Sequence, residues 1–352
     1  MNRKERIKDI LSGKLPDFTP YHFDMTMKMT DRLGEYYGLK GEETEDYIGN
    51  HLLYLDPDGP NGEENGYRGM SENGKTYFDE FGTEWDVSGN YDIGDWGMSG
   101  FPVHDLDFSG YTFPSGKGEG RFTRAKELMK AYPGRFNVMR ITGPLTQAWY
   151  ITGLEDFLMG TLADAAKIEY LLENITRYII ELIDGLPDEV DAVRLIDDYG
   201  IQKGLLISKK HWLRFIEPNY RKIVEAYRRK GVHAMHHSCG DVSELMPDFI
   251  GLGVEMLDAM QPEAMDIAEI KREYGNDIAL FGGMGSQSTI PLGTPDDVRK
   301  EAVRLLEALG KGGRYLFGPA GSIPSEAPID NVVALVEFCK EMQAGHWVDH
   351  VS

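Results

Sequence analysis

VDAVRLIDDYG, residues 190–200, shows the pattern on which the fold rests. Its first seven residues form a mainly apolar run of strand length, and two adjacent aspartates follow directly. Longer segments with a helical period of 3.6 residues flank it at 161–185 and 208–230. Strands that alternate with helices are typical of βα units and a parallel sheet. This stretch therefore predicts one βα unit of an α/β fold.

The same alternation runs through the rest of the chain. Further helical patterns occur near 146–159, 241–252, 265–274, 295–310 and 328–343. Two apolar runs near 19–24 and 51–56 bring the number of candidate strands to eight, which favours a (β/α)8 TIM barrel over a doubly wound sheet. The other six strands are predicted at 137–142, 190–196, 232–237, 254–259, 277–282 and 313–318.

We expect a single domain over residues 1–352, with an N-terminal extension and a small inserted segment. Residues 57–120 are rich in glycine and aromatic side chains and have few helix-length patterns. This insert is either a small sheet that packs its own aromatic residues or a lid whose aromatic residues line a pocket. The aromatic residues in question are Tyr77, Phe78, Phe81, Trp85, Tyr91, Trp96 and Phe101.

Composition narrows the class of function. The formal net charge of −21 repels phosphate backbones and anionic lipid, so nucleic acid and membrane surfaces are poor partners. The N-terminus lacks the apolar core of a signal peptide, and no apolar run approaches the length of a membrane span. Two cysteines exclude a disulfide scaffold. We expect a cytoplasmic enzyme or small-molecule binder.

Polar residues gather where the predicted strands end. In a TIM barrel these loops meet at one mouth, where the chemistry of such folds takes place. The loops after 196, 237, 259, 282 and 318 all carry polar or glycine-rich sequence. The candidate substrate-binding residues are His22, Asp24, Tyr199, Gln202, Gln261, Met284 and Gln287.

Asp197 and Asp198 are the candidate catalytic residues. Adjacent residues at a strand end cannot both point inward, so one is expected to serve the pocket while the other caps the next turn. The pocket carboxylate would orient substrate or donate a proton. The alternative is that both side chains serve only the turn.

His237 and Cys239 lie two residues apart on an extended segment, which points both side chains the same way. Imidazole nitrogen and thiolate sulfur are ligands that zinc prefers, and a catalytic zinc needs a third ligand plus an open position. Asp258 is the predicted third ligand, with Glu255, Asp198 and His22 as alternatives. Without a metal, the pair is a small buried thiol beside a hydrogen-bonded histidine. Cys339 falls on the apolar face of the last helix and is expected in the core.

The chain resembles the uroporphyrinogen decarboxylase superfamily over nearly its whole length. The resemblance implies a (β/α)8 barrel with a deep cleft at its C-terminal mouth, and often a homodimer. The opening segment also looks like the family's start. The segments that carry the resemblance are ITGPLTQAWYITG (141–153), IDDYGIQKGLLIS (196–208), the run from 236 to 275 beginning HHSCGD, FGGMGSQSTIPLGTPDDVRKEA (281–302) and GPAGSIPSEAPIDNV (318–332).

Within the superfamily, the chain resembles the corrinoid-dependent methyltransferases more than the decarboxylases. It shares the His-x-Cys-Gly element at 237–240 and a DEFGxxW segment at 79–85. The decarboxylases' N-terminal Arg-Gln-Ala-Gly-Arg-Tyr motif is missing from the region that follows residue 20. However, the loop at 318–322 also lacks the cysteine that coenzyme M methyltransferases carry there.

The resemblance implies a methyltransferase that moves a methyl group between a small methylated substrate and a corrinoid carried by a partner protein. The substrate class it suggests is an aryl methyl ether, and the cofactor it suggests is zinc. Two other functions stay open. One is a cofactor-free carboxy-lyase of the uroporphyrinogen decarboxylase type, and the other is a non-catalytic binder of a ligand or a corrinoid.

Overall fold

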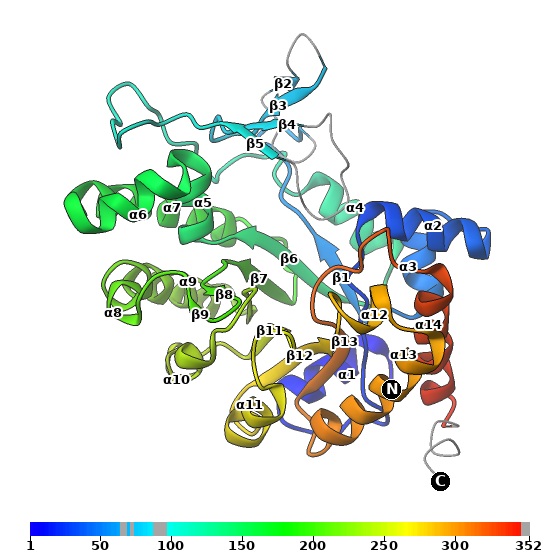
Figure 1. Cartoon of the computed structure of the whole chain (residues 1–352). Coiled ribbons are helices and arrows are strands. Elements are labelled where there is room, and N and C mark those ends of the chain that lie inside the picture. The colour runs from blue at the N-terminus through cyan, green and yellow to red at the C-terminus, as the bar shows by residue number, and fades with distance from the viewer. Residues whose placement is uncertain (64–68, 71–73, 87–96, 346–352) are drawn as a thin grey trace.

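The barrel is built on a parallel sheet of seven strands in the order β1-β6-β7-β10-β11-β12-β13 (Figure 1). The structure, a computed structural model, describes residues 1–63, 69–70, 74–86 and 97–345. The predicted α/β barrel class is confirmed. The strands are β1 (Leu52–Leu55), β6 (Phe136–Thr142), β7 (Ala192–Ile196), β10 (His233–His237), β11 (Met256–Met260), β12 (Ala279–Met284) and β13 (Tyr315–Pro319).

The predicted strand at 19–24 closes the sheet into a barrel without forming a regular strand itself. Tyr21 makes an isolated parallel bridge to Phe317 of β13. On the other side, the His51 amide donates a hydrogen bond of 3.2 Å to the Tyr21 carbonyl, just before β1. The segment therefore lies between the two edge strands and completes the barrel wall.

Helices cover the outside of the sheet, and glycine sets one boundary that the periodicity missed. The predicted helix at 146–159 divides at Gly153, whose φ of 82° is left-handed and ends the first part. The helices are α1 (Arg3–Leu11), α2 (Met27–Tyr37), α3 (Glu42–Ile48), α4 (Thr123–Ala131), α5 (Pro144–Thr152), α6 (Leu154–Ala163), α7 (Ala165–Asp184), α8 (Lys209–His211), α9 (Glu217–Lys230), α10 (Met246–Leu252), α11 (Ile267–Tyr274), α12 (Thr289–Leu292), α13 (Pro295–Leu305) and α14 (Ile329–Gln343).

The predicted insert at 57–120 contains a small antiparallel sheet that stands above the barrel mouth in Figure 1. Its strands are β2 (Gly69–Met70), β3 (Thr76–Phe78), β4 (Glu84–Asp86) and β5 (Gly97–Gly100). Of the aromatic residues predicted to line a lid, Tyr91 and Trp96 lie outside the described residues. A second, shorter hairpin joins β8 (Gly200–Ile201) to β9 (Gly204–Leu205), directly after β7.

The lower part of the barrel interior is apolar and is plugged by α1. Ile7 and Ile10 of α1 pack against inward-facing residues such as Phe136 of β6 and Met256 of β11, all of them fully buried. Because side chains alternate along a strand, further inward positions lie at steps of two residues towards the mouth. The inward position nearest the mouth is polar on β6, β7, β10 and β11, where Arg140, Arg194, His237 and Asp258 form the floor of the site.

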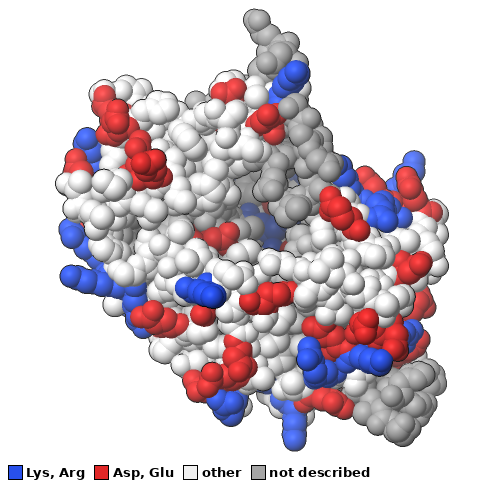
Figure 2. Space-filling view, viewed as in Figure 1, with Lys and Arg blue, Asp and Glu red and all other residues white. Residues whose placement is uncertain are grey.

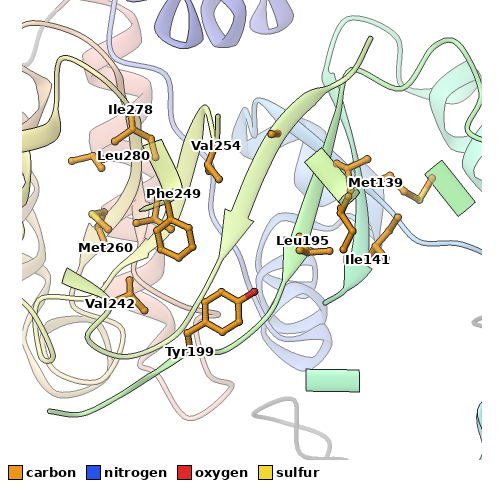
Figure 3. Close-up of a cluster of buried hydrophobic side chains, with 14 of the residues drawn as sticks. Met139, Ile141, Leu195, Tyr199, Val242, Phe249, Val254, Met260, Ile278 and Leu280 are labelled. Carbon is orange, nitrogen blue, oxygen red and sulfur yellow. The ribbon is translucent and has the colours of Figure 1, made fainter. Parts of the chain in front are cut away.

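A separate and larger core lies between the outer face of the sheet and the helices. Met139 and Leu195 project outward from β6 and β7, and Phe249 of α10 packs in the same cluster (Figure 3). This burial gives the strands their continuous apolar character, as expected for a parallel sheet covered by helices. Cys339 of α14 is fully buried in this core, as predicted. Among the described helices, none combines the length and apolar character needed to cross a bilayer.

Candidate active site

Charged side chains occupy the inward positions at the mouth end of the strands. Arg140 of β6 lies in register with Arg194 of β7, and His237 of β10 lies in register with Asp258 of β11. The Arg194 Nη2 atom lies 2.7 Å from Oδ2 of Asp258, and both side chains are almost fully buried. Figure 2 shows a hollow in this face of the molecule, with acidic and basic atoms visible inside it.

Three potential metal ligands converge on one side of this hollow. The Cys239 Sγ atom lies 3.5 Å from Nε2 of His237, and the same Nε2 lies 3.8 Å from Oδ1 of Asp198. One ligand atom from each residue lies within 4.8 Å of those of the other two. Cys239 is exposed to the hollow, whereas His237 and Asp198 are partly buried. The sulfur is therefore accessible to a ligand.

Close packing of two loops brings Asp198 to Cys239. Gly240 has a φ of +78°, and a Cβ built on it would lie 2.4 Å from the Gly200 carbonyl carbon. Only glycine allows the loops after β7 and β10 to approach this closely. The Cys239 amide then donates a hydrogen bond of 2.7 Å to Oδ1 of Asp198, which fixes that carboxylate beside the thiol.

Asp258 fixes the orientation of the His237 ring. The His237 Nδ1 atom lies 3.0 Å from Oδ1 of Asp258 and 2.9 Å from Nη2 of Arg194. A carboxylate at Nδ1 favours the proton on that nitrogen, which directs Nε2 towards Asp198 and Cys239. Burial alone would lower the pKa of His237, but the Asp258 carboxylate raises it to about 10.

The donor set fits zinc. Nitrogen, sulfur and carboxylate oxygen are all zinc ligands, and three protein ligands with an open position are typical of catalytic sites. A histidine whose other nitrogen is held by a carboxylate is the usual outer-shell arrangement. The predicted third ligand, Asp258, instead contacts the opposite nitrogen of the ring. Asp198, one of the alternatives, lies beside Nε2 of His237 instead, because the inward alternation of β7 continues past its last residue.

Asp197, the other candidate catalytic residue, points away from the hollow. Its carboxylate is fully buried and accepts hydrogen bonds from the Thr146 amide (2.6 Å), the Leu145 amide (3.2 Å) and the Tyr199 hydroxyl (2.8 Å). It therefore satisfies free N–H groups in the first turn of α5. Burial raises the pKa of Asp197 to about 6, although these hydrogen bonds oppose the shift. The two carboxylates separate as the alternation predicts.

The predicted substrate-binding residues divide into two groups: four lie at the floor or mouth of the barrel, and three lie elsewhere. His22 and Asp24 reach the polar floor: Asp24 Oδ2 lies 3.5 Å from Nη1 of Arg194, and His22 stacks edge-on against Tyr54. Met284 is fully buried at the end of β12, and the Gln261 side chain accepts a hydrogen bond from the Gly240 amide. The rest lie elsewhere: Tyr199 is buried against Trp212 and His236, and Gln202 and Gln287 are exposed and contact Glu263.

The sequence reasoning missed Arg140, Arg194 and Tyr54. All three lie on barrel strands, and a charged residue inside an apolar strand was the available signal. Arg140 pairs with Asp56 beyond β1, so both arginines are matched by carboxylates. Within the described residues, the Tyr54 hydroxyl, the Arg194 Nε atom and both ring nitrogens of His22 are buried without hydrogen-bond partners. Such unpaired polar atoms indicate that the floor receives water or a polar ligand.

Comparisons with known proteins agree with this architecture. A model of the uroporphyrinogen decarboxylase (URO-D) family matches residues 122–342. The methylated-thiol–coenzyme M methyltransferase of Methanosarcina mazei is 26% identical over 216 residues, which are 61% of this chain and 56% of that protein. The methylcobamide:CoM methyltransferase MtaA of Methanosarcina barkeri is 25% identical over 203 residues, 57% of each protein.

A uroporphyrinogen decarboxylase of Chlorobaculum parvum is 27% identical over 199 residues, 52% of this chain and 53% of that protein. The chain thus matches little more than half the length of these curated relatives. A solved methyltransferase from Methanosarcina mazei has the same fold, with a TM-score of 0.74 and 19% identity over 97% of this chain and 99% of that one. With a family model that matches most of the barrel, the chain belongs to the uroporphyrinogen decarboxylase family.

Proposed function

We propose that this protein is a methyltransferase that moves a methyl group between a small methylated substrate and a corrinoid carried by a partner protein. The observation that carries the proposal is the convergence of Asp198, His237 and Cys239 at the barrel mouth. The similarity to two methyltransferases of coenzyme M metabolism supports the reaction class. An aryl methyl ether is the substrate class that we propose, because aromatic side chains of the insert line a pocket beside the mouth.

We further propose zinc as the cofactor, held by Asp198, His237 and Cys239. Bound zinc supplies Lewis-acid polarisation of the substrate oxygen, which makes that oxygen a better leaving group. The protein's own part is positional. Asp258 holds the His237 ring with Nε2 turned inward, and the Cys239 amide holds the Asp198 carboxylate in place. The exposed Cys239 sulfur leaves one side of the cluster accessible to substrate.

The mouth is poorly suited to a polycarboxylate such as a tetrapyrrole. Recognition of many carboxylates requires arginines that are free to pair with them. The two arginines of the described barrel floor are already engaged, Arg140 by Asp56 and Arg194 by Asp258. This arrangement favours methyl transfer over decarboxylation.

Metal analysis and a methyl-transfer assay together test the proposal. The protein is purified without chelator, and zinc per chain is measured for the wild type, Cys239→Ser and Cys339→Ala. We expect one zinc ion in the wild type and in Cys339→Ala, the matched control in the core, and none in Cys239→Ser. Reduced cobalamin is then offered methoxyarenes, methylamines and methanol, and methylcobalamin is monitored.

Each alternative has its own signature in these experiments. Absence of zinc from the wild type after metal reconstitution overturns the metal site. Activity on uroporphyrinogen that survives chelator establishes a carboxy-lyase instead. Tight corrinoid binding without methyl transfer from any donor supports the non-catalytic binder.

A further inference from the structure

A cavity of about 270 Å³ lies beside the barrel mouth, under the inserted sheet, and shares Arg140 and Asp56 with the barrel floor. Its walls come from β3 and β4 of the insert, from β6, and from helices α5 and α7. Thr142 and Ile196, at the mouth ends of β6 and β7, line it and lie in register with each other. Ile196 is two residues before Asp198, so the cavity adjoins the metal-ligand cluster.

Five aromatic side chains line the cavity: Tyr77, Phe81, Trp85, Tyr150 and Tyr178. Trp85 meets Tyr150 edge-on, with ring centroids 4.9 Å apart, and Phe81 meets Tyr178 in the same way at 4.8 Å. The Thr83 hydroxyl donates a hydrogen bond of 2.9 Å to the Tyr150 carbonyl, which ties the insert to α5. A cavity of 150 Å³ is enough to hold benzene. The volume and lining therefore suit one substituted aromatic ring.

Gln147 provides an unused hydrogen-bond donor in this wall. It lies one turn before Tyr150 on α5, so the two side chains share a helix face and both line the cavity. Gln147 is only 7% exposed, and its Nε2 atom has no hydrogen-bond partner in the described part of the chain. A buried donor without a partner is costly, which points to an acceptor atom on a bound ligand.

The charges around the cavity disfavour an anion. Asp79 lines it and is held by the Trp85 indole N–H at 3.0 Å, and no lysine or arginine of the described residues forms an ion pair with it. Asp56 and Glu80 also line the cavity, but Arg140 and Arg121 neutralise them. Burial raises the pKa of Asp79, and a ligand carboxylate nearby would be repelled by its charge.

We propose that this cavity binds a single uncharged aromatic ring that carries an oxygen acceptor, with Gln147 donating a hydrogen bond to that oxygen. The inference rests on the proposed function, since the ring belongs to the methyl-bearing substrate. The inference adds to that function the place where the ring binds, the preference for an uncharged ring, and the residue that donates a hydrogen bond to its oxygen. Gln147 is thus a specificity-determining residue.

Calorimetric titration with three single-ring ligands tests the charge selectivity. The probes are 2-methoxyphenol (neutral), 3-methoxybenzoate (anionic) and benzyltrimethylammonium (cationic), each at neutral pH. We expect the neutral ring to bind at least about tenfold more tightly than the benzoate, because the Asp79 carboxylate repels an anion in the cavity. The ammonium should also bind more weakly than the neutral ring, because the Asp79 carboxylate already accepts hydrogen bonds from the Trp85 indole and from the Phe81 and Thr83 amides. Equal or tighter binding of the benzoate or of the ammonium overturns the inference.

Replacing Gln147 by methionine tests the hydrogen bond, because methionine keeps the length and removes the donor. We expect binding of 2-methoxyphenol to weaken by about three- to tenfold. Because Nε2 has no hydrogen-bond partner among the described residues, the unfolding temperature should rise by about 1–3 °C rather than fall. Gln343→Met, at the opposite end of the barrel, is the matched control and should leave ligand binding unchanged. Unchanged binding by Gln147→Met, or a lowered unfolding temperature, contradicts the assigned role.

The same titrations on Cys239→Ser separate this inference from the proposed function. The ligand contacts lie outside the metal cluster, so binding of 2-methoxyphenol should persist in this variant. Binding without methyl transfer by the wild type leaves the cavity inference standing and removes the proposed reaction. If the wild type transfers a methyl group from a neutral methoxyarene and Gln147→Met does so at the same rate, the proposed reaction stands and the cavity inference fails.

Discussion

The two ends of the barrel interior are built on the same strands but carry opposite chemistry. At the lower end, Phe136 and Met256 pack against α1 in a dry cluster. At the mouth end of the same strands, Arg140 and Asp258 form ion pairs and surround unpaired polar atoms. A shift of four residues on β6, or of two on β11, separates a core position from a site position.

This difference indicates that the two ends of the barrel interior have different roles, one in stability and one in binding. The apolar side chains of the lower end stabilise the fold by close packing. The loss of side-chain volume there is therefore strongly destabilising. Buried ion pairs add little net stability, but they hold side chains in defined orientations. The lower end is thus expected to determine whether the chain folds, and the mouth to determine what it binds.

The largest predicted effect falls on the lower end. Phe136→Ala leaves a cavity in the fully buried inner cluster and should reduce the free energy of unfolding by about 3–5 kcal/mol. Zinc content of the folded fraction should stay unchanged. Urea unfolding and metal analysis measure the two quantities. Leu162→Ala on the exposed face of α6 is the control, with a change within about 0.5 kcal/mol. Loss of zinc from folded Phe136→Ala would break the comparison.

Removing a charge from the mouth ranks next. Arg194→Met leaves the Asp258 carboxylate buried without its cation and should cost about 3–4 kcal/mol in unfolding free energy. The double variant Arg194→Met/Asp258→Leu removes the buried carboxylate as well, so part of this loss should be recovered, while Asp24 and His237 lose the partners that Arg194 and Asp258 provide. If the double variant is as unstable as the single one, the pair contributes stability of its own and the division between the ends is wrong.

The raised pKa of Asp197 predicts a smaller effect, a pH dependence of the free energy of unfolding. Its pKa is raised from 3.8 to about 6 in the folded protein, so the folded state holds this proton more tightly than the unfolded state. The contribution to stability is therefore greatest below pH 4 and is lost as the pH rises towards 6. The stability difference between wild type and Asp197→Asn should fall by about 2–3 kcal/mol over that interval. A difference that is flat or rises with pH, in unfolding measured from pH 4 to 7, counts against this account.

The smallest stability effect is expected for the neighbouring residue. Asp198→Asn alters a side chain that is 40% exposed, so the unfolding free energy should change by no more than about 0.5 kcal/mol. Zinc affinity should nevertheless fall at least about tenfold, because a charged ligand is lost. Asp197→Asn is the matched control and should retain zinc. Competition with a chromophoric chelator measures the zinc affinity of both variants. Equal zinc affinity in Asp198→Asn and Asp197→Asn removes Asp198 from the proposed ligand set.

Most of the barrel could be predicted from the sequence because strand positions depend on local patterning. The apolar runs at 190–196 and 232–237 correspond to β7 and β10 within two residues. The run at 19–24 was the exception. It has the apolar character of a strand, but it pairs through isolated bridges, which depend on how distant edges meet. The helical pattern at 146–159 divides at Gly153 because that residue has a positive φ, which periodicity does not detect.

The site could be predicted only in part. The proximity of His237 and Cys239 could be predicted because their spacing on a strand is a local signal. Which of Asp258 and Asp198 faces the pair could not be decided from the sequence, because that depends on which nitrogen of the ring each carboxylate reaches. The sequence offered an aromatic pocket under the insert only as one of two alternatives, and it gave no sign of Gln147, which lines the cavity with Trp85 only after the insert folds back over α5.

Asp197 and Asp198 are joined by one peptide bond, and they link the proposed aromatic site to the proposed metal site. Asp197 anchors the first turn of α5, the helix that presents Gln147 to the aromatic cavity, while Asp198 belongs to the metal cluster. A ligand that displaces α5 therefore acts on the strand end that carries the proposed metal ligand. If both proposed ligands bind, thermodynamic linkage requires reciprocity: the factor by which the ring changes zinc affinity equals the factor by which zinc changes affinity for the ring.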